Sequence, residues 1–304
     1  SLHDAFPIYV EEALEYLKSS NSPSPDGRSN LQIVRHPTDA QIGRSPLKSS
    51  NPVVPTIGIV GVGHVGSLVA KMAKSRGYRV LLNDPPKEDM LRERGDLSSF
   101  VSLDEIARES DIITFHTPLT RDGDYPTWHI CDRAFLEKCK PGAVIINAAR
   151  GGIIDEAAIL SLHSQLSTLN SPLSTLNSQL STSLNSQLST LNSQLSTSLN
   201  SQLSTLNFII DTWEGEPRIS RQMLQRAQIA TYHIAGYTLQ GKINATNLCL
   251  EALCRHFSLP KLQIPAEALP PQPPTKPGWI TKVDRQLRQH PEQFETLRET
   301  YPLR

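Results

Sequence analysis

The chain has 304 residues, of which 38% are hydrophobic, and its 30 basic residues balance 30 acidic ones. Zero net charge gives no global attraction to nucleic acid or anionic membranes, and no apolar run approaches the roughly 20 residues that span a bilayer. The acidic N-terminal stretch lacks the basic region of a signal peptide. Because the four cysteines show no metal-binding spacing, we expect reduced thiols, no metal site and a cytoplasmic protein with no nucleic-acid or membrane partner.

The first 55 residues divide into a predicted helix and a long loop. Apolar residues at helical spacing predict a helix over residues 7–18. Ser, Pro, Asn and charged residues then dominate residues 19–55, a composition that is typical of a linker or an irregular loop.

From residue 56 onward, short apolar runs alternate with helical patterns. We predict strands at residues 56–60, 79–84, 111–117, 143–149, 208–213 and 229–234. Helices are predicted at residues 64–77, 102–110, 132–139, 155–163, 219–227 and 243–257. Ser102, with Glu105, and Asp155 stand where they would cap two of these helices. This alternation predicts an α/β fold, a doubly wound parallel sheet with helices on both faces.

Residues 164–207 interrupt the pattern with six near-copies of one unit, SQLSTLN or SQLSTSLN, without a single charge. The leucines recur three and four apart, which would suit an amphipathic helix. However, Ser, Thr and Asn compete for the backbone in a helix, and the eight-residue units break the phase. We therefore expect a surface excursion between a helix and a strand that leaves the sheet intact, since lengthening a loop costs little closure entropy.

A glycine motif follows the first predicted strand. Gly61-x-Gly63-x-x-Gly66 lies between that strand and a predicted helix, which is the context of a dinucleotide-binding fingerprint. The three glycines permit a tight turn, close approach of a pyrophosphate and close packing of helix on strand, and the helix start offers N–H groups to phosphates. Asp84, 18 residues after Gly66, can bind the adenosine ribose and would repel a 2′-phosphate. We predict NAD rather than NADP.

Three polar residues stand at or just past the ends of late strands, where open α/β sheets bind ligands: Arg150, Glu216 and His233. His233 has the intrinsic pKa of a general base, and Glu216 could fix its tautomer. A planar guanidinium such as that of Arg150 can grip a carboxylate with two hydrogen bonds. Together they suit oxidation of an α-hydroxy acid. Singly, each is more often structural, and His116 is an equally placed rival for the base.

The segments GVGHVG, HTPLT, NAARGGIIDE, DTWEGEP and HIAGYTLQGK together resemble the D-isomer-specific 2-hydroxyacid dehydrogenase family. The resemblance covers about residues 56–163 and 208–257 and, more loosely, 280–304. It implies an NAD-dependent enzyme that acts on a small phosphorylated 2-hydroxy acid, with Arg150, Glu216 and His233 as catalytic residues. The implied cofactor contacts are Gly61, Gly63, His64, Val65, Gly66, Asp84, Thr117, Asp211 and Gly236, and the implied substrate contacts are Arg150 and Tyr237.

The resemblance also implies a division of the chain. Residues 1–55 would be an interdomain helix and linker left from a substrate domain, and residues 56–234 a Rossmann NAD-binding domain with the insertion at 164–207. Residues 235–264 would form a helix returning to the substrate domain, and residues 265–304 a segment that dimerises. Two alternatives stay open: a family member with another substrate, such as phosphoglycerate or glyoxylate, and an NAD-binding protein without turnover.

Overall fold

The computed structural model describes residues 54–96, 99–161, 206–237, 239–265 and 279–301. The helix predicted at residues 7–18, most of the loop and of the repeat, and residues 266–278 lie outside this part of the chain. None of the helices it contains is long and apolar enough to cross a membrane.

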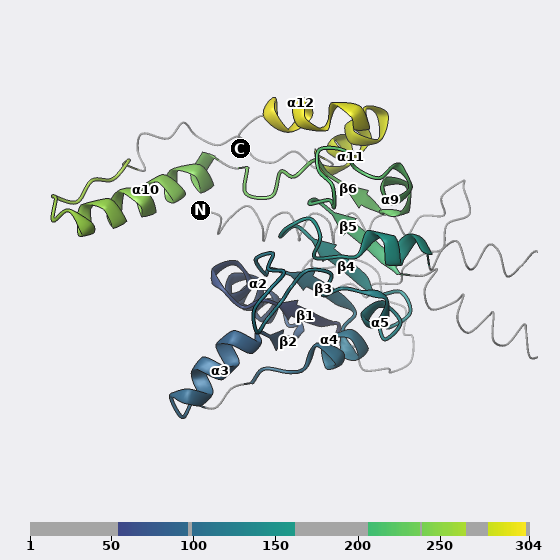
Figure 1. Ribbon diagram of the computed structural model, residues 1–304, viewed down its shortest axis with the longest axis horizontal. Helices are drawn as coiled ribbons and strands as arrows, with labels where there is room; N and C mark the ends of the chain where they lie inside the picture. The colour runs from purple at the N-terminus through teal and green to yellow at the C-terminus, as the bar shows by residue number, and fades with distance from the viewer. Residues whose placement is uncertain (1–53, 97–98, 162–205, 238, 266–278, 302–304) are drawn as a thin grey trace, which may run out of the picture.

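Six parallel strands form one sheet in the order β2-β1-β3-β4-β5-β6 (Figure 1). The strands are β1 (Thr56–Val60), β2 (Arg79–Asn83), β3 (Ile112–Phe115), β4 (Val144–Asn147), β5 (Asn207–Ile210) and β6 (Ile229–Ala230). Every residue of β1, β3, β4 and β5 is buried, as expected for a parallel sheet that is covered on both faces.

The helices between the strands cover both faces of the sheet. They are α2 (His64–Ser75), α3 (Pro85–Glu93), α4 (Leu103–Glu109), α5 (Arg133–Leu136), a helix at residues 156–161 and α9 (Arg221–Arg226). Alternate strand residues enter two separate cores: Ile112 packs in the core that includes α2, and Ile113 in the core that includes α4 and α5. The predicted doubly wound α/β sheet is therefore confirmed.

The order of the strands reverses next to β1. From β1 the chain passes outward to β2 and then returns to β3 on the other side of β1. Phe100 adds only an isolated bridge to Leu82 beyond β2. In open α/β sheets the ligand crevice lies outside the carboxyl ends of the strands at such a reversal, which here means the turns after β1 and β3.

Strands β4 and β5 pair in register across the repeat, from Val144 opposite Asn207 to Asn147 opposite Ile210. The sheet is thus intact, as predicted. The interpretation of the whole repeat as a surface excursion is wrong for its last two residues, because Leu206 is 1% exposed and Asn207 begins β5. An apolar leucine beside a strand joins the core regardless of the repetitive sequence that precedes it.

Helix α3 was missed by the sequence analysis. It begins with two prolines, which are tolerated in the first turn of a helix. Asp84 caps this helix, since its Oδ1 accepts a hydrogen bond from the Lys87 backbone N–H at 3.1 Å.

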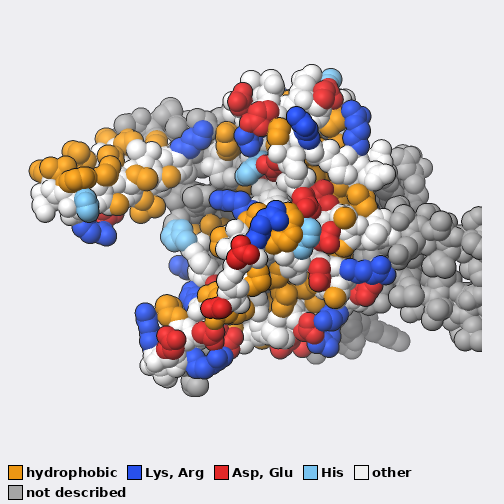
Figure 2. Space-filling model, viewed as in Figure 1, with side chains coloured by type: hydrophobic (Ala, Val, Ile, Leu, Met, Phe, Trp, Pro, Cys, Tyr) orange, Lys and Arg blue, Asp and Glu red, His pale blue; other side chains and the backbone are white. Residues whose placement is uncertain are grey.

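Helix α10 (Leu239–His256) extends away from the sheet (Figure 1). Hydrophobic side chains gather over it (Figure 2), and Leu248, Leu253 and Phe257 are more than half exposed. Apolar side chains in this number on one projecting helix indicate a surface that another structure covers.

The C-terminal segment packs on the sheet edge in the same chain. It comprises α11 (Trp279–Gln289), the 3-10 helix η2 (Pro291–Gln293) and α12 (Phe294–Glu299). Leu287 and Phe294 are fully buried, and Asp284 Oδ1 accepts from the Ala230 backbone N–H of β6 at 2.8 Å. Arg288 donates to the Leu224 carbonyl oxygen at 2.6 Å. The predicted domain boundary before this segment does not separate it from the core of the NAD-binding domain.

We expect Leu287→Ala to lower the free energy of unfolding by about 2–5 kcal/mol, because it leaves a cavity between the C-terminal segment and the sheet. Leu262→Ala is the matched control, since Leu262 is 56% exposed and its truncation should cost less than about 0.5 kcal/mol. Denaturant unfolding measures both. Equal stabilities of the two variants would show that the segment does not dock on the sheet.

Candidate active site

The turn between β1 and α2 is shaped by its glycines. Gly61 has φ +87°, and a Cβ there would lie 2.8 Å from the carbonyl carbon of His116. A Cβ on Gly66 would lie 2.0 Å from the Gly61 carbonyl oxygen. Both positions therefore require glycine, the first for its backbone conformation and the second for close packing of the helix on the turn.

The start of α2 is open to an anion. Its N-cap, Gly63, is exposed, has no atom within 4 Å of where a Cβ would stand, and makes no side-chain cap. The first turn, which includes His64 and Val65, carries no acidic residue. A helix start without a competing carboxylate fits a pyrophosphate, which the backbone N–H groups and the helix dipole attract.

Asp84 follows β2 and ties the glycine turn to α3. Its Oδ2 accepts from the Val62 backbone N–H at 2.7 Å, and the Lys87 ammonium in turn donates to the Val62 carbonyl oxygen at 2.8 Å. Each carboxylate oxygen can accept a second hydrogen bond. Asp84 is partly exposed, so a ribose hydroxyl can be the further donor that the sequence analysis predicted.

Thr117 packs against Gly61, and its methyl carbon would be 2.9 Å from a Cβ there. Its hydroxyl is buried without a hydrogen-bond partner in the described structure. An unsatisfied buried hydroxyl costs about 1–3 kcal/mol. Its place beside the glycine turn fits a residue whose hydroxyl is satisfied by a bound cofactor.

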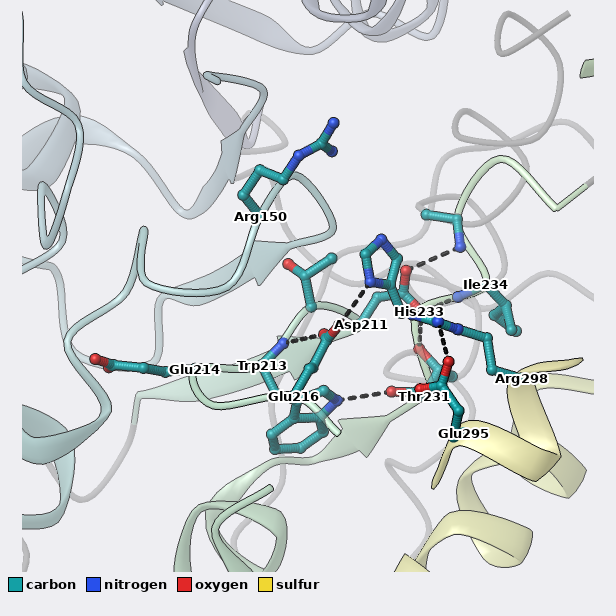
Figure 3. A network of polar contacts seen from close by, with 12 residues as sticks. Arg150, Asp211, Trp213, Glu214, Glu216, Thr231, His233, Ile234, Glu295 and Arg298 are labelled. Atoms are coloured by element: carbon teal, nitrogen blue, oxygen red, sulfur yellow. Dashed lines mark hydrogen bonds and ion pairs between the residues drawn. The ribbon is translucent and has the colours of Figure 1, made fainter. Parts of the chain in front are cut away.

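Asp211 is fully buried at the end of β5 and organises the loop that carries His233. Its carboxylate accepts from the Thr231 hydroxyl at 2.6 Å and from the backbone N–H groups of Ile234 and Ala235 at 2.9 and 2.8 Å. Burial raises the pKa of Asp211, and these three donors oppose that shift. The contact with a cofactor implied for Asp211 stays a prediction, while its hold on the loop is plain in Figure 3.

Glu216 and His233 meet as predicted from the sequence (Figure 3). Glu216 Oε2 lies 2.7 Å from His233 Nδ1, and Glu216 Oε1 accepts from the Trp213 backbone N–H at 2.6 Å. The hydrogen bond to Glu216 raises the pKa of His233, against the opposing effect of burial. His233 has φ +57°, a conformation that non-glycine residues adopt at some cost. With Nδ1 engaged, Nε2 is the nitrogen left for a substrate.

Arg150 stands on the neighbouring loop, and the structure does not join it to the pair. Its Nη1 donates to the Ala149 carbonyl oxygen at 2.6 Å, and its guanidinium points away from His233 (Figure 3). The two loops nevertheless touch, since a Cβ on Gly151 would lie 2.0 Å from the Trp213 carbonyl oxygen. Arg150 is exposed and keeps donors for an anionic ligand.

The remaining predicted positions lie nearby in the chain. Gly236 has φ +83°. The Lys242 ammonium lies over the ring of Tyr237, 4.3 Å from its centroid, in a cation–π contact. The rival base, His116, is a poor one, because burial lowers its pKa to about 3. Its Nε2 lies 3.1 Å from the Thr114 hydroxyl.

The sequence analysis missed the residues that hold the pair in place. Trp213 is 1% exposed, and its indole N–H donates to the Thr231 carbonyl oxygen at 2.7 Å. Thr231 in turn donates to Asp211. The sequence offered one weak signal for these two residues. Trp213 stands close to Asp211 after β5, and Thr231 stands close to His233 after β6.

Comparison with known proteins agrees with this geometry. Residues 38–166 match the family described as D-isomer specific 2-hydroxyacid dehydrogenase, NAD binding domain. The chain is 36% identical to the erythronate-4-phosphate dehydrogenase of Bacteroides thetaiotaomicron, over 95% of this chain and 75% of that protein. Its counterpart from Bacteroides fragilis strain YCH46 is 38% identical, over 82% of this chain and 63% of that protein. The chain thus spans three quarters or less of these relatives.

Among solved structures, the NAD+-bound 3-phosphoglycerate dehydrogenase of Entamoeba histolytica is 21% identical, with a TM-score of 0.47 over 73% of this chain and 58% of that one. The family match identifies the cofactor of the domain as NAD, and the open start of α2 fits it.

We expect Asp84→Asn to weaken NAD binding by about 1–3 kcal/mol, because a charged acceptor for the ribose is lost while the hydrogen bond from Val62 can persist. Binding of NADP should suffer less, since the repulsion of its 2′-phosphate is also removed. Calorimetry with both dinucleotides measures this, with Asp96→Asn, at an exposed position, as the control. A wild-type protein that prefers NADP would contradict the assignment of Asp84.

We expect Glu216→Gln to lower the pKa of His233, because the imidazolium loses its charged partner. The raised pKa means that the pair stabilises the fold below the ordinary histidine pKa and loses this contribution as pH rises through the native pKa. The stability difference between wild type and variant should therefore be larger at about pH 5.5 than at about pH 9. NMR titration and unfolding measure the two effects. An unchanged pKa would show that the hydrogen bond does not govern His233.

Proposed function

The chain belongs to the D-isomer-specific 2-hydroxyacid dehydrogenases, and we propose that it oxidises 4-phospho-D-erythronate with NAD in the synthesis of pyridoxal 5′-phosphate. The observation that carries the proposal is the 2.7 Å contact between Glu216 and His233 at the carboxyl edge of an NAD-binding sheet. The choice of substrate follows the relatives, which are named erythronate-4-phosphate dehydrogenases.

In this proposal His233 is the general base. Nε2 accepts the proton of the substrate's 2-hydroxyl group, while Glu216 on Nδ1 stabilises the imidazolium that forms. Bound NAD would accept the hydride that C2 loses as the hydroxyl proton leaves, which is the chemistry that this cofactor supplies. The product is 2-oxo-3-hydroxy-4-phosphobutanoate.

Arg150 is the proposed anchor for the substrate carboxylate. Its planar guanidinium can donate two parallel hydrogen bonds, which would orient C2 as well as hold it. In the structure it is exposed, and its Nη1 donates to its neighbour's carbonyl oxygen. The side chain would turn toward His233 when the carboxylate binds. Tyr237, four residues beyond His233, is proposed as a second substrate contact.

We further propose that the protein is a cytoplasmic homodimer. All four cysteines are free, which suits a reducing compartment. The exposed apolar side chains of α10, Leu248 and Leu253 among them, and Phe257 directly after it form a surface that a second copy could bury together with residues 265–304.

The test is NADH formation when 4-phospho-D-erythronate is added to the protein with NAD. D-3-phosphoglycerate and glycolate serve as competing substrates for the alternative family members. His233→Ala should abolish most turnover and leave NAD affinity near normal, whereas His256→Phe, at the end of α10, should change neither. NAD binding without turnover of any of these acids would favour an NAD-binding protein that is not an enzyme.

We expect Arg150→Lys to lower turnover roughly 100-fold, comparable to the loss of one oriented donor at a developing charge. Lysine keeps the positive charge but loses the two-pronged geometry. Steady-state kinetics on the variant measure this, and Arg94→Lys, which alters an exposed arginine at the end of α3, is the control. A near-normal rate would mean that Arg150 contributes only charge.

A further inference from the structure

The loop after β5 presents two glutamates in opposite directions. Glu216 faces His233, and Glu214 points away from it (Figure 3). Glu214 is anchored twice on its own side. Its backbone N–H donates to Glu156 Oε1 at 2.9 Å, and its carboxylate Oε1 lies 3.1 Å from Nε2 of His129. Because a carboxylate only accepts, His129 is the donor. The loop is thus held from both sides.

His129 also grips the loop that carries Arg150. Its backbone N–H donates to the Gly152 carbonyl oxygen at 2.8 Å. Its ring stacks on Trp128 with centroids 4.2 Å apart, and Trp128 covers Gly152 so closely that a Cβ there would lie 2.3 Å from the indole. One residue therefore contacts the segment two positions after Arg150 and the segment two positions before Glu216.

The backbone of His129 is held in an unfavourable conformation. Its φ is +54°, and a non-glycine residue in this region costs of order 1–3 kcal/mol and persists only where the surroundings enforce it. Within the described residues only His129, His233 and Ser258 are non-glycine residues with positive φ. Two of the three are thus linked through the Glu214–Glu216 loop.

The cluster does not need an ion to explain it. His129, Asp155 and Glu214 offer ligand atoms within 4.8 Å of one another, a separation that a cation could bridge. However, Nε2 is already hydrogen-bonded to Glu214, and Nδ1 lies 3.7 Å from Asp155 Oδ2. Asp155 Oδ1 is also engaged, since it accepts from the Ala158 N–H at the start of the helix.

We propose that His129 is a positioning residue for the reaction assigned above, which fixes the Glu216 loop against the Arg150 loop and so keeps the base aligned with the carboxylate anchor. The role in catalysis rests on the proposed function. The effect of His129 on the position of Glu216 does not, because it can be measured in the protein without substrate. It acts through Glu214 and Gly152 and touches neither substrate nor cofactor.

The decisive variant is His129→Phe, which keeps a ring to stack on Trp128 but cannot donate to Glu214. If the loop loosens, Glu216 holds His233 less well, and the pKa of His233 falls toward the ordinary histidine value. The direct charge effect has the opposite sign, since an unpartnered Glu214 would make the surroundings more negative and raise that pKa. NMR titration of His233 without substrate therefore separates loosening of the loop, which lowers the pKa, from the direct charge effect, which raises it. The result is independent of which acid is oxidised.

Three further measurements complete the test. His129→Gln, whose amide can still donate to Glu214, should keep the pKa of His233 near that of wild type, and so should His256→Phe. With the proposed substrate, His129→Phe should lower kcat at least tenfold and leave the KM for NAD unchanged. If His129→Phe does not fold, His129→Asn replaces it, because asparagine tolerates positive φ and is too short to reach Glu214.

Two outcomes would overturn the proposal. If the variant lacking the donor unfolds at lower temperature but leaves the pKa of His233 unchanged, His129 only stabilises the fold. If Zn²⁺ binds the wild-type protein tightly but not His129→Phe, the cluster is a metal site.

Discussion

The buried carboxylate of Asp211 is the constraint on which the site depends. Asp211 directly follows β5 and is fully buried. Water therefore cannot solvate its charge, and its partners must come from the protein. It finds them in the Thr231 hydroxyl and the backbone N–H groups of Ile234 and Ala235, on both sides of His233. The loop that carries the base is therefore wrapped around a buried charge, and loss of its partners would cost several kcal/mol.

This arrangement also sets the chemistry of the base. His233 is bonded to Glu216 and lies in the field of Asp211, and both raise its pKa. For His116, which follows β3, burial is the dominant effect and lowers its pKa to about 3. Two histidines at the same edge of one sheet thus differ in basicity, because carboxylates raise the pKa of one and burial lowers the pKa of the other.

The sheet and most of its helices could be predicted from the sequence, since buried parallel strands leave a strong local pattern. The apolar run of β4, for example, predicts a buried strand without any information about the strands beside it. Helix α3 was missed because it buries no residue and so leaves no strong apolar pattern, and β6 is shorter than the apolar run that encodes it. Docking of α11 on β6 was not predictable, because Asp284 is separated by 54 residues of chain from Ala230, whose backbone N–H donates to it.

The site divides in the same way. Glu216 and His233 were found because strand ends meet at one edge, a rule of topology. The guanidinium of Arg150 was expected beside them but points away (Figure 3), because strand topology places a backbone position and does not fix the direction of an exposed side chain. His129 left no signal at all, because its partners lie 23 and 85 residues away in the chain and only the folded loops bring them together.

The repeat is compatible with this site because of where it joins the sheet. The described chain leaves the helix at residues 156–161 and returns at Leu206, directly before the amino end of β5. Glu216, His233 and Arg150 follow the carboxyl ends of their strands, at the opposite edge. Pairing of β4 with β5 depends on the strands and on their buried side chains, while each doubling of a connection costs only about 0.6 kcal/mol in closure entropy. An insertion at the amino edge can therefore lengthen without moving the residues that do the chemistry, provided that Leu206 keeps its place in the core.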